Sequence, residues 1–274
     1  MSSQERLSPI RRILMAMDAS VSGMAALESA LALASQMEAE VLGLFVEDAN
    51  LLRFAELPFA REVNLFSART RRLDSGEMER TLRAQASRAE AALIEAAARQ
   101  RVRCSFRVVR GDVTTQLLAA SRDIDLVALG ITRQQFRRIS PTVRAIVSAA
   151  QSSVLLLPAD AQVRTPVAVV YDGSPASVRA LSVARYLSQM QDSILIVLTT
   201  GKTGDPRAEI ADQLEGGGLT VRYSFLPEVD IAGVVQDAQQ EAAGTLILCA
   251  SLCLKEGTLE ELLEQLDCTV LLVR

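Results

Sequence analysis

The chain has 274 residues, of which 49% are hydrophobic and 23% are charged, a balance typical of a globular protein with a substantial core. Its formal net charge of −4 argues against the broad positive field of a nucleic-acid-binding protein. Histidine is absent, which excludes Ser-His-Asp triads, Cys-His dyads and histidine metal sites.

The N-terminal stretch MSSQERLSPIRR lacks the apolar core of a signal peptide. No apolar run approaches the roughly 18 residues that a membrane-spanning helix needs. We therefore expect a cytoplasmic protein without membrane insertion. The four cysteines show no zinc-ligand spacing, and Cys249 and Cys253, at or just after an apolar run, are expected to be buried reduced thiols.

The first predicted elements are an apolar strand that starts at Ile13 and an amphipathic helix that reaches Gln36, with Asp-x-Ser between them. The same pattern recurs later in the chain, where Asp18 aligns with Asp172 and the serine two residues on aligns with Ser174. A serine in this place predicts a helix N-cap, because its hydroxyl can accept a hydrogen bond from a free backbone amide.

The first copy continues with the apolar strand EVLGLFVED and then a long insertion. Apolar residues at helical spacing predict an amphipathic helix over residues 75–100. The stretch 51–70 mixes Leu, Phe and Arg, and its Phe54, Phe59 and Phe66 are expected to pack on the neighbouring copy or to form a lid over the strand ends. Dimerisation through this stretch is a further possibility. A strand, a turn, a helix and a strand ending in DLVALG follow, and then a helix and the strand SSVLLLP.

The second copy repeats this order without the long insertion. Its strands, like those of the first copy, are continuous apolar runs, which is typical of a parallel sheet covered by helices on both faces. The polar stretch PADAQVRTP predicts the boundary between two α/β domains of five strands each. We expect a first domain over residues 1–158, with a helical extension at 50–100, and a second, shorter domain over 166–274.

Together, the Asp-x-Ser turns, the DLVALG strand and the closing SSVLLLP strand resemble the universal stress protein family. The resemblance spans both copies, and it implies a tandem member. It further implies two doubly wound, five-stranded parallel sheets of order 3-2-1-4-5, of the adenine nucleotide alpha hydrolase-like fold, packed as a pseudo-dimer. The last strands, Val154–Leu157 and Val270–Val273, would pair across that pseudo-dimer.

Nucleotide-binding members of this family carry an Asp after the first strand, an apolar residue near the end of the second, and the motif Gly-x2-Gly-x9-Gly-(Ser/Thr) around the phosphates. Glycines allow close approach of backbone amides to phosphate, and the helix start adds a positive dipole. The corresponding candidate site in the first copy consists of Asp18, Val46, Gly130, Arg133, Thr142 and Val143.

This motif is degenerate in both copies. In the first, Arg133 and Pro141 replace the second and third glycines and the spacing is two residues short. Pro141 removes an amide donor but suits the first turn of a helix capped by Ser140. Arg133, Arg137, Arg138 and Arg144 could bind phosphate through their guanidinium groups, line a solvated loop, or contact the other copy.

In the second copy, Ala250 and Cys253 take the places of the first two glycines, and six residues are missing. Its degenerate candidate site is Asp172, Gly257 and Thr258. Both loops are interpreted as connectors that retain parts of a nucleotide motif. Asp18 and Asp172 can equally satisfy amides at their own strand-to-helix turns.

The favoured function is a non-enzymatic cytoplasmic role in the stress response, through binding of protein partners or a small ligand. An alternative is a regulatory protein that binds ATP or AMP in the first domain, and another is a weak nucleotide hydrolase. No other cofactor and no metal is expected. The protein partners are not identified by the sequence, nucleic acid is not expected among them, and a homodimer is possible.

Overall fold

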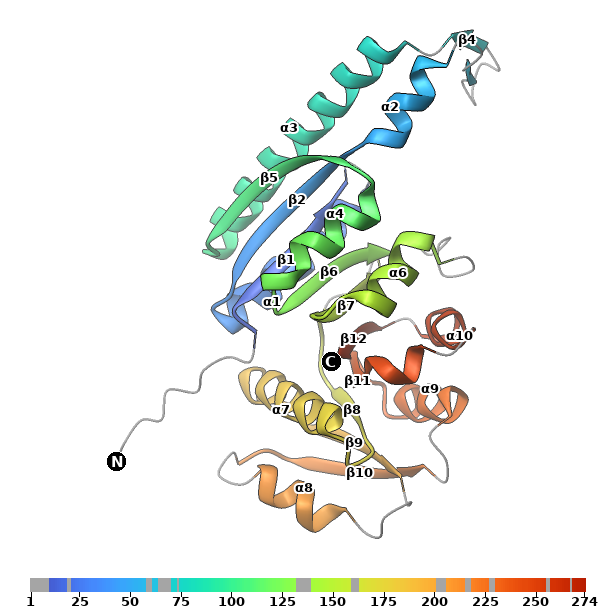
Figure 1. The fold of residues 1–274 in the computed structure, drawn as a ribbon. Coiled ribbons are helices and arrows are strands. Elements are labelled where there is room, and N and C mark those ends of the chain that lie inside the picture. Colours follow the sequence, from blue (N-terminus) through green and yellow to red (C-terminus); the bar gives the residue numbers. More distant parts are fainter. Residues whose placement is uncertain are drawn as a thin grey trace.

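One ten-stranded sheet runs through the whole protein in the computed structural model (Figure 1). The structure describes residues 10–18, 21–57, 61–63, 70–72, 74–131, 139–158, 163–200, 206–214, 218–226, 230–254, 257–266 and 268–274. The first half contributes β1 (Arg12–Met17), β2 (Glu40–Asp48), β5 (Cys104–Gly111), β6 (Leu126–Ile131) and β7 (Ser153–Pro158). The second half contributes β8 (Val167–Tyr171), β9 (Leu195–Thr200), β10 (Val221–Leu226), β11 (Thr245–Cys249) and β12 (Thr269–Val273).

The strand order is β10-β9-β8-β11-β12-β7-β6-β1-β2-β5. Within each half the order is therefore 3-2-1-4-5, and all neighbouring strands of a half run parallel. This confirms the predicted fold class. Parallel neighbours require crossover connections, which explains why helices alternate with strands along the chain.

Helices cover both faces of this sheet, and two apolar clusters fill the space beneath them. One face is covered by α1 (Val21–Met37), α3 (Ser75–Gln100), α7 (Pro175–Met190) and α8 (Arg207–Leu214). The other is covered by α4 (Val113–Ala120), α6 (Pro141–Ala149), α9 (Ile231–Gln240) and α10 (Thr258–Gln265). Burial on both faces accounts for the continuous apolar strands, since every residue of β8, β11 and β12 is buried.

The two halves join where β7 pairs with β12 in antiparallel orientation. Leu155 lies opposite Leu271, and Leu156 lies opposite Val270. The predicted pairing of the last strands is confirmed. The limits proposed for the two domains stay a prediction, and residues 159–162 of the proposed boundary lie outside the described residues.

A helical arm extends beyond the sheet of the first half, on the side away from the second half (Figure 1). It consists of α2 (Ala49–Glu56), the antiparallel pair β3 (Arg61–Val63) and β4 (Thr70–Arg72), and the first part of α3. The amphipathic helix predicted over residues 75–100 is confirmed. Its predicted apolar residues are all buried: Leu82, Ala86, Ala89, Leu93 and Ala97.

The expected packing of residues 51–70 on the other half is wrong for Phe54. This side chain is 49% exposed, and its helix, α2, contacts α3 and β5 of its own half. Phe59 and Phe66 lie outside the described residues. In the second half, which lacks the long insertion, the short helix α8 lies between β9 and β10.

Candidate functional site

Those candidate nucleotide residues of the first half that the structure describes lie toward the carboxyl edge of the sheet. The chain passes from β1 to β2 on one side, and it returns through β5 to β6 on the other side of β1. The strand order therefore reverses between β1 and β6, and such a switch point is where open α/β sheets bind ligands. Asp18 follows β1 directly, and Gly130 is the next-to-last residue of β6.

The exposed Asp18 lies against the first turn of α1. A Cβ atom on Gly23 would lie only 2.2 Å from Asp18 Oδ1, so the glycine is what allows the carboxylate to take this position. An acidic group beside a helix N-terminus is favourable because the helix dipole is positive there. These surroundings are compatible with the predicted alternative that Asp18 stabilises its own strand-to-helix turn.

Val46 lies in β2, where it pairs with Val109 of β5. Its side chain is partly buried and packs against the apolar cluster on the α4 side of the sheet. It is thus an apolar residue near the carboxyl end of the second strand, as predicted. Its role in supporting a base stays a prediction.

Thr142 and Val143 lie in the first turn of α6, and their polar groups already have partners. Ser140 is the N-cap, and its Oγ accepts a hydrogen bond of 3.2 Å from the Val143 amide. The predicted cap by Ser140, with Pro141 in the first turn, is confirmed. Thr114 Oγ1 of α4 donates a hydrogen bond of 3.1 Å to Thr142 Oγ1.

Arg144 connects the two halves. Its guanidinium forms an ion pair with Glu260 of α10, and so the structure assigns it to contact with the other half among the three predicted alternatives. Arg133, Arg137 and Arg138 lie outside the described residues, so their predicted phosphate contacts stay untested.

The strand register revises the alignment of the two halves at this edge. Leu126 of β6 lies opposite Ile13, and Thr245 of β11 lies opposite the corresponding Val167. Counting along each strand places Cys249, and not Ala250, at the position of Gly130. The sequence alignment, which placed Ala250 at the position of Gly130, was therefore one residue out.

With this register, the two halves differ at the point where their strand order reverses, between β1 and β6 in the first half and between β8 and β11 in the second. The buried Cys249 Sγ lies 3.8 Å from the Oγ of Ser174, across the junction of β11 and β8. Burial raises the pKa of the Cys249 thiol, which keeps it neutral. Glycine has no side chain to make the same contact in the first half.

Asp172 and Ser174 stabilise the start of α7. Asp172 Oδ1 accepts a hydrogen bond of 3.0 Å from the Ser174 amide, and Ser174 Oγ accepts one of 3.1 Å from the Ser177 amide. Partial burial opposes the charge of Asp172, but hydrogen bonds from Ser174 and Ser177 outweigh it and lower the pKa of the carboxyl. Ser174 is the predicted N-cap, whereas its counterpart at position 20 lies outside the described residues.

The remaining candidates of the second half, Gly257 and Thr258, begin α10. Gly257 is the N-cap, with a φ of 82°, a left-handed conformation that favours glycine. Glu260 and Glu261 follow in the first turn, so carboxylates lie where a phosphate would need positive charge. The preceding turn, η3 (Ala250–Cys253), is packed inward by two buried residues, Ala250 and Cys253.

Among the residues that the structure describes, no group of three or more Cys, Asp or Glu side chains could hold a metal ion. None of the helices described there is long and apolar enough to cross a membrane. Cys249 and Cys253 are buried free thiols, as predicted, and burial raises the pKa of Cys253 to about 12.

The model of the universal stress protein family matches residues 9–158. The chain belongs to this family. A search of curated proteins found no match.

This universal stress protein has the fold of a solved universal stress protein from Archaeoglobus fulgidus, with a TM-score of 0.74 and 15% identity over 97% of this chain and 98% of that one. One from Burkholderia pseudomallei is 22% identical over 55% of this chain and 98% of that one, with a TM-score of 0.39. Another, from Lactobacillus plantarum, is 18% identical over 54% and 97%, again with a TM-score of 0.39. The first comparison extends the shared architecture across both halves.

Sequence reasoning missed the partners that engage the candidate groups. Thr114 and Glu260 each lie far along the chain from the residue that they contact, and no local pattern marks such pairs. The role of Cys249 follows from the sheet register, which pairs Leu126 with Ile13 and Thr245 with Val167 and which no local sequence pattern fixes.

Proposed function

We propose that this protein acts in the cytoplasm as a non-enzymatic regulator in the stress response, by binding a protein partner or a small ligand. One observation carries the proposal: among the described residues, groups that could stabilise a transferred phosphate already have partners in the fold. The Val143 amide donates to the Ser140 cap of α6, Arg144 pairs with Glu260, and two carboxylates lie in the first turn of α10. Catalysis of phosphate transfer depends on donors directed at the developing charge.

Incubation of the purified protein with ATP tests the absence of turnover. We expect no release of ADP, AMP or phosphate above the rate in a boiled-protein control. An activity that co-elutes with the protein and is lost in Asp18→Ala would contradict the proposal, because it would make the candidate site catalytic. Partner proteins can be sought in parallel by affinity capture with the full chain.

A second candidate function is the binding of ATP or AMP by the first half alone. The difference between Gly130 and Cys249 favours this function. In the second half, the Cys249 thiol contacts Ser174 where β8 and β11 end. In the first half, Gly130 has no side chain to make such a contact. Asp18 is exposed beside the same position. The adenine nucleotide would lie across the ends of β1 and β6.

Calorimetric titration with ATP and with AMP tests this second function. We expect binding of one nucleotide per chain, weakened at least tenfold in Asp18→Ala. Asp172→Ala is the matched control, since it removes the equivalent carboxylate from the second half, and it should leave the affinity unchanged. No heat at millimolar nucleotide, or equal losses in both variants, would contradict binding at the first half.

A further inference from the structure

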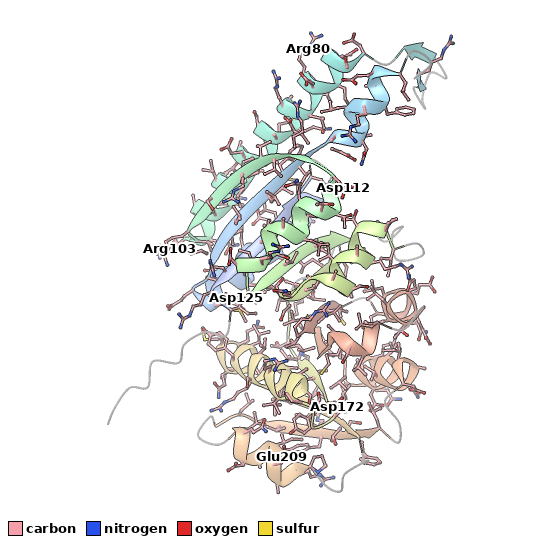
Figure 2. All side chains as sticks on the ribbon, in the orientation of Figure 1. Arg80, Arg103, Asp112, Asp125, Asp172 and Glu209 are labelled. Atoms are coloured by element: carbon pink, nitrogen blue, oxygen red, sulfur yellow. The ribbon has the colours of Figure 1, made fainter. Side chains whose placement is uncertain are left out.

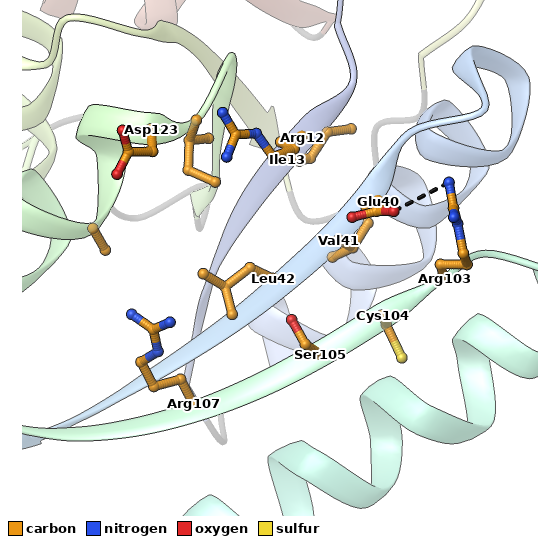
Figure 3. A pocket seen from close by; sticks show the side chains of 12 residues that line it. Arg12, Ile13, Glu40, Val41, Leu42, Arg103, Cys104, Ser105, Arg107 and Asp123 are labelled. Carbon is orange, nitrogen blue, oxygen red and sulfur yellow. Dashed lines mark ion pairs between the residues drawn. The ribbon is translucent and has the colours of Figure 1, made fainter.

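A cavity of about 390 Å³ lies at the amino edge of the first half, opposite the edge that carries Asp18 (Figure 3). Figure 2 shows the two ends of β5 well apart, with Arg103 at this edge and Asp112 at the other. The cavity is lined by the starts of β1, β2 and β5 and by residues between α4 and β6. Its lining includes none of the described residues of the candidate nucleotide site.

The floor of this cavity is a part of the sheet that helix α4 leaves uncovered. Strand pairing places Leu42 beside Ser105, and both belong to the cavity lining. Leu42 packs against the same apolar cluster as Ala120 and Ile124, which form the wall at the end of α4. A partly exposed apolar floor thus meets an apolar wall.

Guanidinium groups border this floor on two sides. Figure 3 shows Leu42 between Arg107, from β5, and Arg12, from β1. Neither of these guanidinium groups forms an ion pair with a described residue, whereas Arg103 at the same edge pairs with Glu40 at 3.1 Å. The lining carries three arginines against the two carboxylates of Glu40 and Asp123, so its net charge is positive.

We propose that this cavity binds a small amphipathic anion, whose apolar body covers Leu42 and whose carboxylate or phosphate head is bound by Arg107. Guanidinium binds either head group through paired, charge-assisted hydrogen bonds. Asp123 and the carbonyl end of α4 border the opposite wall, where both disfavour negative charge. The head group therefore lies at the β5 side of the cavity.

Four six-carbon probes with different head groups test this site: hexanoate, hexyl phosphate, 1-hexanol and hexylammonium. Each is titrated into the full chain at low ionic strength, with binding followed by calorimetry or by saturation-transfer NMR. We expect the two anions to bind at least tenfold more tightly than hexanol, and hexylammonium to bind more weakly than hexanol. The two anions also distinguish a carboxylate ligand from a phosphate ligand.

Arg107→Gln is expected to weaken hexanoate or hexyl phosphate binding at least tenfold. Arg88→Gln is the matched control, because Arg88 is an exposed arginine of α3, the helix on the opposite face of the sheet. Circular dichroism should show the same fold for both variants. Equal affinity for hexanol and hexanoate, an unchanged affinity in Arg107→Gln, or equal losses in both variants would each overturn the proposal.

Discussion

Leu271→Ala is expected to lower the free energy of unfolding by about 2–5 kcal/mol, the usual cost of deleting a buried leucine side chain. Leu271 is 1% exposed, and it lies opposite Leu155 in the strand pair that joins the two halves. The smaller side chain would leave a cavity beside the β7–β12 strand pair, through which the sheets of the two halves join. Urea denaturation followed by circular dichroism measures the change.

Leu254→Ala provides the control for this stability measurement. Leu254 is 48% exposed, so the same truncation should change the free energy of unfolding by no more than about 0.5 kcal/mol. Similar losses in the two variants would mean that the β7–β12 pairing contributes little, contrary to the structure. A loss confined to Leu271→Ala would show that the buried packing of β12, at the strand pair that joins the halves, stabilises the protein.

The stability of the protein is expected to fall by roughly 2–3 kcal/mol as the pH rises from 10 to above 12, through ionisation of Tyr171. Burial, and then the hydrogen bond of 2.8 Å that its hydroxyl donates to Glu209, raise the pKa of Tyr171 from 10.0 to about 12. The folded state therefore favours the neutral phenol. Its contribution is fully present below pH 10, and it is lost as the pH rises through 12.

Tyr171→Phe isolates this effect, because the variant lacks the phenol but keeps the aromatic ring in the core. Its free energy of unfolding, measured by chemical denaturation at several pH values, should fall less steeply between pH 10 and 12 than that of the natural chain. The other tyrosines and the lysines titrate in both proteins and cancel in the comparison. Parallel curves for the two proteins would refute a raised pKa at this position.

Most of the fold could be predicted because the strands and helices carry their own signals. Continuous apolar runs indicate strands buried on both faces, as β8 and β11 are. The spacing of Leu82, Leu93 and the alanines between them predicted α3 from end to end. The repeat then extended these local assignments to the whole chain.

The strand order and the pairing of β7 with β12 required more than local signals. They came from the family resemblance, because apolar strands carry no mark of which neighbour they join. The arm was less predictable still. Phe54 was expected to pack on the other half or to form a lid, and the first alternative is wrong because α2 packs on α3 and β5 of its own half.

At the candidate site, the sequence indicated which residues lie near the carboxyl edge but not what they contact. Ser140 could be recognised as a cap because its signal lies within four residues. The ion pair of Arg144 with Glu260 could not, because it depends on how the two halves meet. The alignment of Gly130 with Ala250 was wrong for the same reason, since only the sheet register fixes equivalent positions.

The antiparallel pair of β7 and β12 joins two halves of one polypeptide, and this affects how the protein responds to dilution. Two separate subunits joined by such a strand pair would come apart on dilution, with a midpoint set by their dissociation constant. Here the linker at residues 159–166 keeps the partner strand at a fixed effective concentration. The paired halves should therefore persist at nanomolar protein, however scarce the chain becomes in the cell.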